Sequence, residues 1–277
     1  MGHHYSGAVV GPAYGSRAIG MYPGIFLAGV FVLIGALASR VVSTYVSLAS
    51  TTGPYSAAVL VSFIAATNLT TFLKVPTSTI QVYAFAVLGS AVAVGSRINL
   101  VLLAILIIGW VVAPVASHYL SRVIYSVLRE SKKLRFVIIG IMAYSATVLG
   151  LNDVSNAASS LVGSGVDILL AKVVCGLSMY LGMIMWGPRL ARRMGEELIR
   201  MDYRKAVSAQ LTKSVCISAL NYLGLNASMN QTTVSALSAL GAKKDVLRGI
   251  VKGWIYSPIL GFVSAYALSI VLKIGGV

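Results

Sequence analysis

Long apolar runs recur along almost the whole chain, and they constrain its fold more than any other feature. Because the hydrocarbon core of a bilayer is about 30 Å thick, a helix that crosses it needs roughly 20 predominantly apolar residues. Hydrophobic residues make up 57% of the 277 residues and charged residues only 10%, which leaves more apolar surface than a soluble domain could bury. The sequence therefore predicts an all-α, polytopic transmembrane protein. The long runs are 22–39, 55–73, 99–126, 136–152, 166–187, 206–224 and 247–275, and the shorter runs 78–95 and 227–241 lie between them.

The basic residues are distributed unevenly between the connections. If every run crosses the bilayer, most Lys and Arg residues fall on one side, and only Arg40, Arg97 and Lys273 fall on the other. The positive-inside rule then predicts a cytoplasmic location for the basic side. The net charge of +15 is explained without nucleic-acid binding, which would need a basic soluble face. The most basic loops are 127–135, 189–205 and 243–248, and Arg122, Lys172, Lys213 and Lys252 fall within or near helix ends.

Three weak matches occur in the same order in both halves of the chain. They pair residues 2–8 with 150–156, residues 75–81 with 225–231, and Gly109, Trp110 and Pro114 with Gly253, Trp254 and Pro258. Because corresponding helices would run in opposite directions, we expect two inverted repeats, an arrangement that supports alternating access in transporters. The expected units of this one membrane domain are the repeat 1–126, a cytoplasmic linker 127–135 and the repeat 136–277.

Asp153 is an acidic residue well inside an apolar stretch, with Asn152 and Asn156 beside it. A carboxylate at the bilayer centre costs about 2.5–3.5 kcal/mol on insertion scales, so it usually faces a cavity, an ion or a partner. The segment 150–163 is rich in Gly, Asn and Ser, which tolerate an interrupted helix and offer oxygens to a cation. A cation site at Asp153 is the prediction, and the alternative is an N-cap of a second half-helix. Asp167 fits a helix end.

Hydrogen-bonding side chains begin the two short helices. Helix N-termini present free N–H groups and the positive end of the dipole, which suits an oxyanion. We predict that the two matched Ser-x-x-Gln clusters contact a substrate; the alternative is helix capping and interhelical hydrogen bonding. The clusters contain Ser78, Thr79 and Gln81 in the first half, and Ser228, Asn230, Gln231, Thr232 and Thr233 in the second.

Other residues carry no chemistry that would suggest an enzyme or an ATP-driven pump. The sequence has no Walker A loop, no HExxH motif and no embedded Ser/His/Asp set. Cys175 and Cys216 are expected to be small buried hydrophobes because they show no redox spacing. His118 is expected to be a packing or interface residue.

Residues 150–157, Gly-Leu-Asn-Asp-Val-Ser-Asn-Ala, resemble the GANDVANA signature of the inorganic phosphate transporter (PiT) family, which also includes sulfate permeases. Residues 76–81, 187–198 and 11–18 look like other segments of that family. The resemblance implies a phosphate symporter coupled to Na⁺ or H⁺, with discontinuous helices at the midplane, homodimeric assembly and no cofactor. It places Asp153 and Asn156 at the cation. It places the following residues at the phosphate: Asn152, Ser78, Thr79, Gln81, Ser228 and Gln231.

The first half departs from the family pattern. Where the first signature has Asn, Asp and Asn, this chain has His4, Tyr5 and Ala8, so one of two expected carboxylates is missing. The sequence begins at this signature, and we expect the half-helix that should precede it to lie upstream or to have been lost. Altered stoichiometry, proton coupling and loss of coupling are the resulting alternatives.

Three functions remain open from the sequence. The leading hypothesis is inward symport of phosphate with a cation, both bound near Asp153. A sulfate permease of the same family is the second. A non-transporting membrane homologue that acts as a sensor or partner subunit is the third, because of the departures in the first half.

Overall fold

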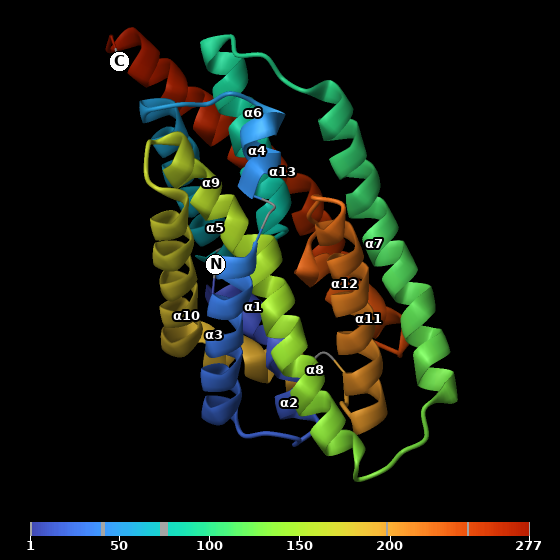
Figure 1. The fold of residues 1–277 in the computed structure, drawn as a ribbon. Helices are drawn as coiled ribbons and strands as arrows, with labels where there is room; N and C mark the ends of the chain where they lie inside the picture. The colour runs from blue at the N-terminus through green and yellow to red at the C-terminus, as the bar shows by residue number, and fades with distance from the viewer. Residues whose placement is uncertain (1, 40–41, 73–76, 198, 243, 277) are drawn as a thin grey trace.

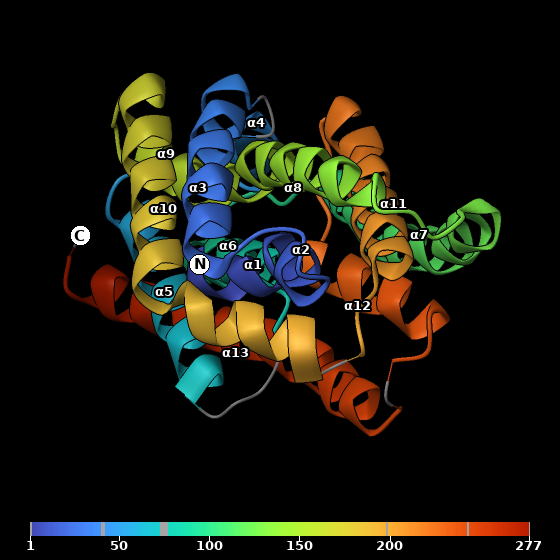
Figure 2. The same ribbon diagram turned by 90° about the horizontal axis from the view of Figure 1, so that it is seen from below.

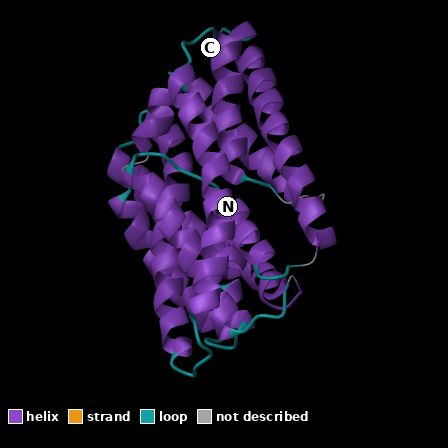
Figure 3. Cartoon of the chain, turned by 90° about the vertical axis from the view of Figure 1, so that its right-hand side faces the viewer, coloured by secondary structure: helices purple, strands orange, loops and turns teal. Residues whose placement is uncertain are grey.

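The computed structural model describes residues 2–39, 42–72, 77–197, 199–242 and 244–276, and these residues form helices without a strand (Figures 1 and 3). In the first half the helices are α1 (Gly2–Val9), α2 (Gly11–Gly15), α3 (Met21–Ala38), α4 (Val42–Leu48), α5 (Pro54–Phe72), α6 (Thr79–Val94) and α7 (Leu100–Val127). In the second half they are α8 (Leu134–Leu149), the π-helical turn η1 (Gly150–Val154), α9 (Ser155–Gly163), α10 (Ile168–Arg192), the π-helical turn η2 (Arg193–Glu197), α11 (Tyr203–Tyr222), α12 (Met229–Ala239) and α13 (Lys244–Ile274).

Every apolar run in the sequence forms a helix, which confirms the all-α transmembrane prediction. Within the described part of the chain, five helical stretches are long and apolar enough to cross a bilayer. Their outer surfaces carry large apolar side chains, as at Val111, Leu181 and Val263, which are 59%, 57% and 55% exposed. Such a surface would be costly in water and is favourable against lipid. The protein is therefore a multi-pass membrane protein.

Helices from the two halves of the chain interleave. The helix α6 packs along α13, α12 packs along α7, and α1 packs along α10. Seen along the bundle (Figure 2), α1 and α6 lie in the middle, between α3 and α8 on one side and α13 on the other. Glycine permits the closest of these approaches, because a Cβ at Gly89 would lie 2.2 Å from the carbonyl oxygen of Phe262. The two halves therefore share one interior.

Residues 2–15 form two helices that the apolar pattern did not indicate. Their break falls at Val10, and Pro12 stands in the first turn of α2. The N-terminus lies at mid-height of the molecule (Figure 1), and Tyr5 on α1 is fully buried. The helix α4 was likewise absent from the prediction, because 42–48 is too short to stand out as an apolar run.

The predicted interruption near Asp153 takes the form of a π-helical turn. The stretch Leu134–Gly163 is one continuous helical path, in which η1 replaces an unwound segment. A π-turn widens the helix locally and is frequent at functional sites. Arg40, Lys74, Val75, Pro76 and Lys243, which entered the repeat and the loop-charge predictions, lie outside the described residues. The inverted repeat and its boundaries stay predictions.

Candidate functional site

The short helices α6 and α12 begin in the same way. Ser78 and Ser228 are their N-cap residues, with extended backbones. The Ser78 hydroxyl accepts a hydrogen bond from the Gln81 N–H at 3.5 Å, and the Ser228 hydroxyl accepts one from the Gln231 N–H at 3.3 Å. The two serines therefore have the capping role that was the alternative to substrate contact. Capping leaves other first-turn N–H groups without intrahelical partners.

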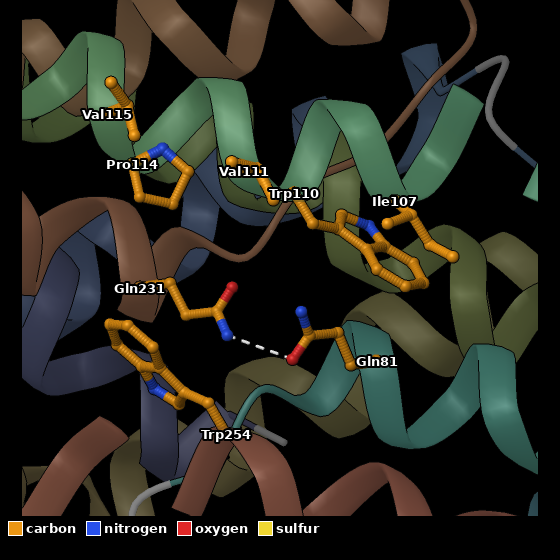
Figure 4. Close-up of a pocket in the computed structure, with 8 residues that line it drawn as sticks. All are labelled: Gln81, Ile107, Trp110, Val111, Pro114, Val115, Gln231 and Trp254. Carbon is orange, nitrogen blue, oxygen red and sulfur yellow. Dashed lines mark hydrogen bonds between the residues drawn. The ribbon is translucent and has the colours of Figure 1, made fainter. Parts of the chain in front are cut away.

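The starts of α6 and α12 meet through their glutamines. The Gln231 amide nitrogen donates to the Gln81 amide oxygen at 3.0 Å, and both side chains point into a cavity of about 340 Å³ (Figure 4). Trp110 of α7 and Trp254 of α13 line the same cavity. Each of these pairs is a pair that the sequence repeat matched. The remaining lining residues come from α7 and are apolar: Ile107, Val111, Pro114 and Val115.

Asp153 lies on η1 and is fully buried. Its two carboxylate oxygens accept from different side chains, Oδ1 from the Tyr5 hydroxyl and Oδ2 from the Asn152 amide at 2.8 Å. The Tyr5 hydroxyl is also hydrogen-bonded to the hydroxyl of Thr79, the first residue of α6. Tyr5 therefore connects the buried carboxylate to one of the two capped helix starts.

Asp153 does not cap a helix. The N-cap of α9 is Val154, which makes no side-chain hydrogen bond, and the Asp153 carboxylate is engaged with side chains instead. Asp167 shows the contrasting case, because its Oδ1 accepts from the N–H groups of Leu169 and Leu170 at 2.9 and 3.0 Å. The capping alternative is wrong for Asp153, and the helix-end prediction for Asp167 is confirmed.

The asparagines of η1 and α9 bind the segment before α12. Asn152 donates to the Ala227 carbonyl at 2.8 Å and accepts from the Ala227 N–H at 3.2 Å. Asn226 donates to the Asn156 amide oxygen at 2.8 Å, accepts from the Tyr45 hydroxyl at 2.7 Å, and its carbonyl accepts from the Trp110 indole at 3.1 Å. The structure thereby brings the predicted site residues together in one buried region.

Several residues of this region were missed from the sequence. The sequence marks Tyr5 only as the place of a missing carboxylate, whereas the structure shows its hydroxyl in contact with Asp153. Asn226 belongs to a matched repeat segment, which was a usable signal. Tyr45 gave no signal, because nothing in a single sequence relates it to Asn226, which lies far along the chain.

Lys213 corrects a sequence prediction. The sequence predicts a position within or near a helix end, but Lys213 lies in the middle of α11 and is fully buried. Among the side chains that the structure describes, Asp153 and Lys213 are the buried ones of a charged residue type. The Lys213 ammonium donates to the Ala8 carbonyl oxygen at 2.6 Å. Both groups therefore contact α1, one through the Tyr5 hydroxyl and one through the backbone.

The residues expected to pack behave in that way. His118 of α7 bonds through Nδ1 to the Ser238 hydroxyl at 3.0 Å, next to the end of α12. Cys175 and Cys216 are free cysteines that are partly buried. Neither observation adds a chemical group to the site.

Known proteins resemble this chain along most of its length. A family model described as the phosphate transporter family matches residues 1–139 and 129–249. A protein of Methanocaldococcus jannaschii named "Putative phosphate permease" is 24% identical over 276 residues, 94% of this chain and 89% of that protein. The sulfate permease CysP of Bacillus subtilis is 26% identical over 294 residues, 96% of this chain and 82% of that protein.

A solved structure described as "The sodium-dependent phosphate transporter" shares the fold. It superposes with a TM-score of 0.86 at 17% identity, over 99% of this chain and 95% of that chain. The similarity extends over nearly the complete chain, so it includes the helices that carry Asp153 and the capped starts of α6 and α12.

Proposed function

This chain belongs to the phosphate transporter family, and we propose that it moves inorganic phosphate inward as a cation-coupled secondary transporter. Members of this family are transporters and not enzymes. One observation carries the proposal: the capped N-termini of α6 and α12 meet at the Gln81–Gln231 hydrogen bond, beside the buried Asp153. Two positive dipole ends and a carboxylate can bind an oxyanion and a cation next to each other.

The proposed phosphate ligands are the polar groups at the two helix starts. Ser78, Thr79 and Gln81 would serve from α6, Ser228 and Gln231 from α12, and Asn152 from η1. An anion between the two starts would replace the Gln81–Gln231 contact, because both amides can rotate their N–H groups toward it. The adjoining cavity provides the room for this rearrangement.

The proposed cation ligand is Asp153. Na⁺ and H⁺ both remain candidates, because a carboxylate can coordinate one and bind the other. The Asn156 amide oxygen is occupied by Asn226, whereas its buried amide nitrogen lacks a partner among the described atoms. An unpaired amide N–H suits an oxyanion better than a cation, so Asn156 as a cation ligand needs a rotation of its side chain.

Alternating access is part of the proposal, with the site near the midplane. The packing between the two halves supports it: α6 of the first half packs on α13 of the second, and α12 of the second half packs on α7 of the first. The cavity adds to this support, because its glutamines and tryptophans come as matched pairs from both halves. Rocking one repeat against the other would open such a site to each side in turn.

The proposed orientation places the basic loops 127–135, 189–205 and 243–248 in the cytoplasm. The junctions from α7 to α8 and from η2 to α11 lie at the same end of the molecule, the lower end in Figure 1. Their basic residues would then face the same compartment, as the positive-inside rule requires. Assembly as a homodimer is also proposed, from the family resemblance alone.

Purified protein in proteoliposomes tests the function. We expect uptake of radiolabelled phosphate that requires an inward Na⁺ or H⁺ gradient and is abolished in Asp153→Asn. Asp167→Asn is the matched control, because Asn also caps a helix well and this carboxylate lies outside the site. Undiminished uptake by Asp153→Asn would exclude the assigned cation site. Absence of uptake in the wild type under every gradient would favour the non-transporting alternative.

Sulfate transport is the second candidate, supported by the 26% identity to a sulfate permease. The two anions differ in one respect that matters here: phosphate at neutral pH carries a P–OH donor, whereas sulfate offers acceptors only. Each Asp153 carboxylate oxygen has a second lone pair, which could accept from phosphate and not from sulfate. Competition by unlabelled sulfate at equal concentration decides between them, since a phosphate transporter would retain most of its uptake.

A further inference from the structure

The buried Lys213 has no role in the proposed site, although it lies next to the helix that holds Tyr5. A lysine in the interior of a membrane protein is costly and needs a partner or a function. Its ammonium donates at 2.6 Å to the carbonyl oxygen of Ala8, in the last turn of α1. The cost of burying this side chain is therefore met by a backbone oxygen and not by a carboxylate.

The sequence leaves that carbonyl without its usual partner. In a continuous helix the Ala8 oxygen would accept from the N–H of residue 12, but residue 12 is a proline. The neighbouring Val9 carbonyl accepts from the side-chain amide of Gln210, one turn before Lys213 on α11. The break between α1 and α2 thus exposes carbonyl oxygens at the negative end of a helix dipole, which attract a cation.

The repeat relates this position to the cation site of the second half. Tyr5 and Ala8 match Asp153 and Asn156, so the first half lacks the carboxylate and carries an ammonium beside the matched helix. Tyr5 in place of a carboxylate removes one negative charge from the region, and the Lys213 ammonium contributes one positive charge. An anionic substrate then needs fewer mobile cations to compensate its charge.

We propose that the Lys213 ammonium is a tethered cation that takes the place of a diffusible coupling ion at the break between α1 and α2. Only the second half, at Asp153, then binds a free cation during transport. This inference rests on the proposed function for its transport consequence. Its binding consequence is independent: removal of the ammonium vacates a position at the Ala8 carbonyl. One turn earlier on α11, the Gln210 amide oxygen is buried without a partner among the described atoms, and a rotation of that amide could turn it toward an ion.

Thermal unfolding of purified protein in 100 mM NaCl and in 100 mM choline chloride tests the binding consequence. We compare Lys213→Ser, which leaves space for an ion, with Lys213→Met, which fills the space without an oxygen ligand. We expect Lys213→Ser to gain a sodium-specific rise of about 3 °C over that of the wild type, from the linkage of binding to stability. Lys213→Met should show no gain. An equal response of Lys213→Ser and the wild type to sodium overturns the inference.

Transport assays of Lys213 variants distinguish a lysine that acts as a tethered cation from a lysine that only caps α1. We expect the sodium dependence of phosphate uptake to become steeper in Lys213→Ser, with a Hill coefficient rising from about one toward two. Lys213→Arg should retain the wild-type dependence, because it keeps the charge. If Lys213→Gln, which can still bond the Ala8 carbonyl, keeps the wild-type dependence, the role is structural and the inference fails. If the wild type shows no uptake, the proposed function fails and the unfolding comparison still decides this inference.

Discussion

Replacing Tyr5 by phenylalanine tests the central contact of the site. The change removes the hydroxyl that donates to Asp153 and bonds to Thr79, and it leaves the ring in place. A hydrogen bond to a carboxylate contributes about 1.5–3 kcal/mol, and one between neutral side chains in a membrane protein about 0.6 kcal/mol. The sum, about 2–3.5 kcal/mol, corresponds to a fall in melting temperature of about 4–7 °C for a chain of this size.

The assay is thermal unfolding of purified protein in sodium-free detergent solution. Tyr144→Phe is the matched control, because the Tyr144 hydroxyl donates to the Ser218 hydroxyl at 2.7 Å and Tyr144 is 38% exposed. Its loss should lower the melting temperature by about 1 °C. An equal fall in both variants would refute the reasoning, because the Asp153 contact would then contribute no more than a bond at the surface.

Two further predictions concern helix packing and the cavity. Gly150→Ala should reduce the yield of monodisperse protein in size-exclusion chromatography by more than half, because its Cβ would lie 2.1 Å from the Val32 carbonyl oxygen. Gly140→Ala, with nothing within 4 Å of the added Cβ, should leave the yield unchanged or higher. Gln231→Ala should raise the KM for phosphate by about tenfold, the effect of losing one hydrogen-bond donor of about 1.4 kcal/mol. The control Asn68→Ala, whose side chain donates to the Ile64 carbonyl of the same helix, should leave it unchanged.

The lipid-facing part of the fold was predictable, because lipid contact requires long apolar runs. Helices such as α7 and α10 expose one face to the bilayer and are apolar over more than 20 residues. The helices α1 and α2 contact protein on most sides, so they do not need a long apolar run. Their sequences contain Gly, His, Ser and Tyr residues instead. Hydropathy identifies helices that contact lipid, whereas α1 and α2 are surrounded mainly by other helices of the protein.

The site was predictable as far as the repeat extended. Asp153 was predicted because a carboxylate in an apolar stretch needs a partner, and the glutamines at 81 and 231 were predicted because they fall in matched segments of the two halves. The hydrogen bond between these glutamines was not predicted. Lys213 was missed for a physical reason. The run 206–224 also contains Ser, Thr and Gln residues, so the lysine does not stand out within it. Its partner is a backbone carbonyl, which leaves no trace in the sequence.

Tyr5 changes what a cation at Asp153 must overcome. In the structure the hydroxyl already satisfies one carboxylate oxygen, so an arriving Na⁺ has to displace a hydrogen bond of about 1.5–3 kcal/mol. At 1.4 kcal/mol per tenfold change, this competition weakens sodium binding by about 10- to 100-fold relative to a free carboxylate. Tyr5→Phe should therefore bind Na⁺ more tightly while being less stable without it, and NaCl should restore part of its lost melting temperature. A proton on Asp153 would not compete in this way, because a neutral carboxyl group can still accept from the tyrosine hydroxyl. If NaCl does not raise the melting temperature of Tyr5→Phe and transport follows the proton gradient, the coupling ion is H⁺. The tyrosine in place of the first-half carboxylate then marks a change of coupling ion.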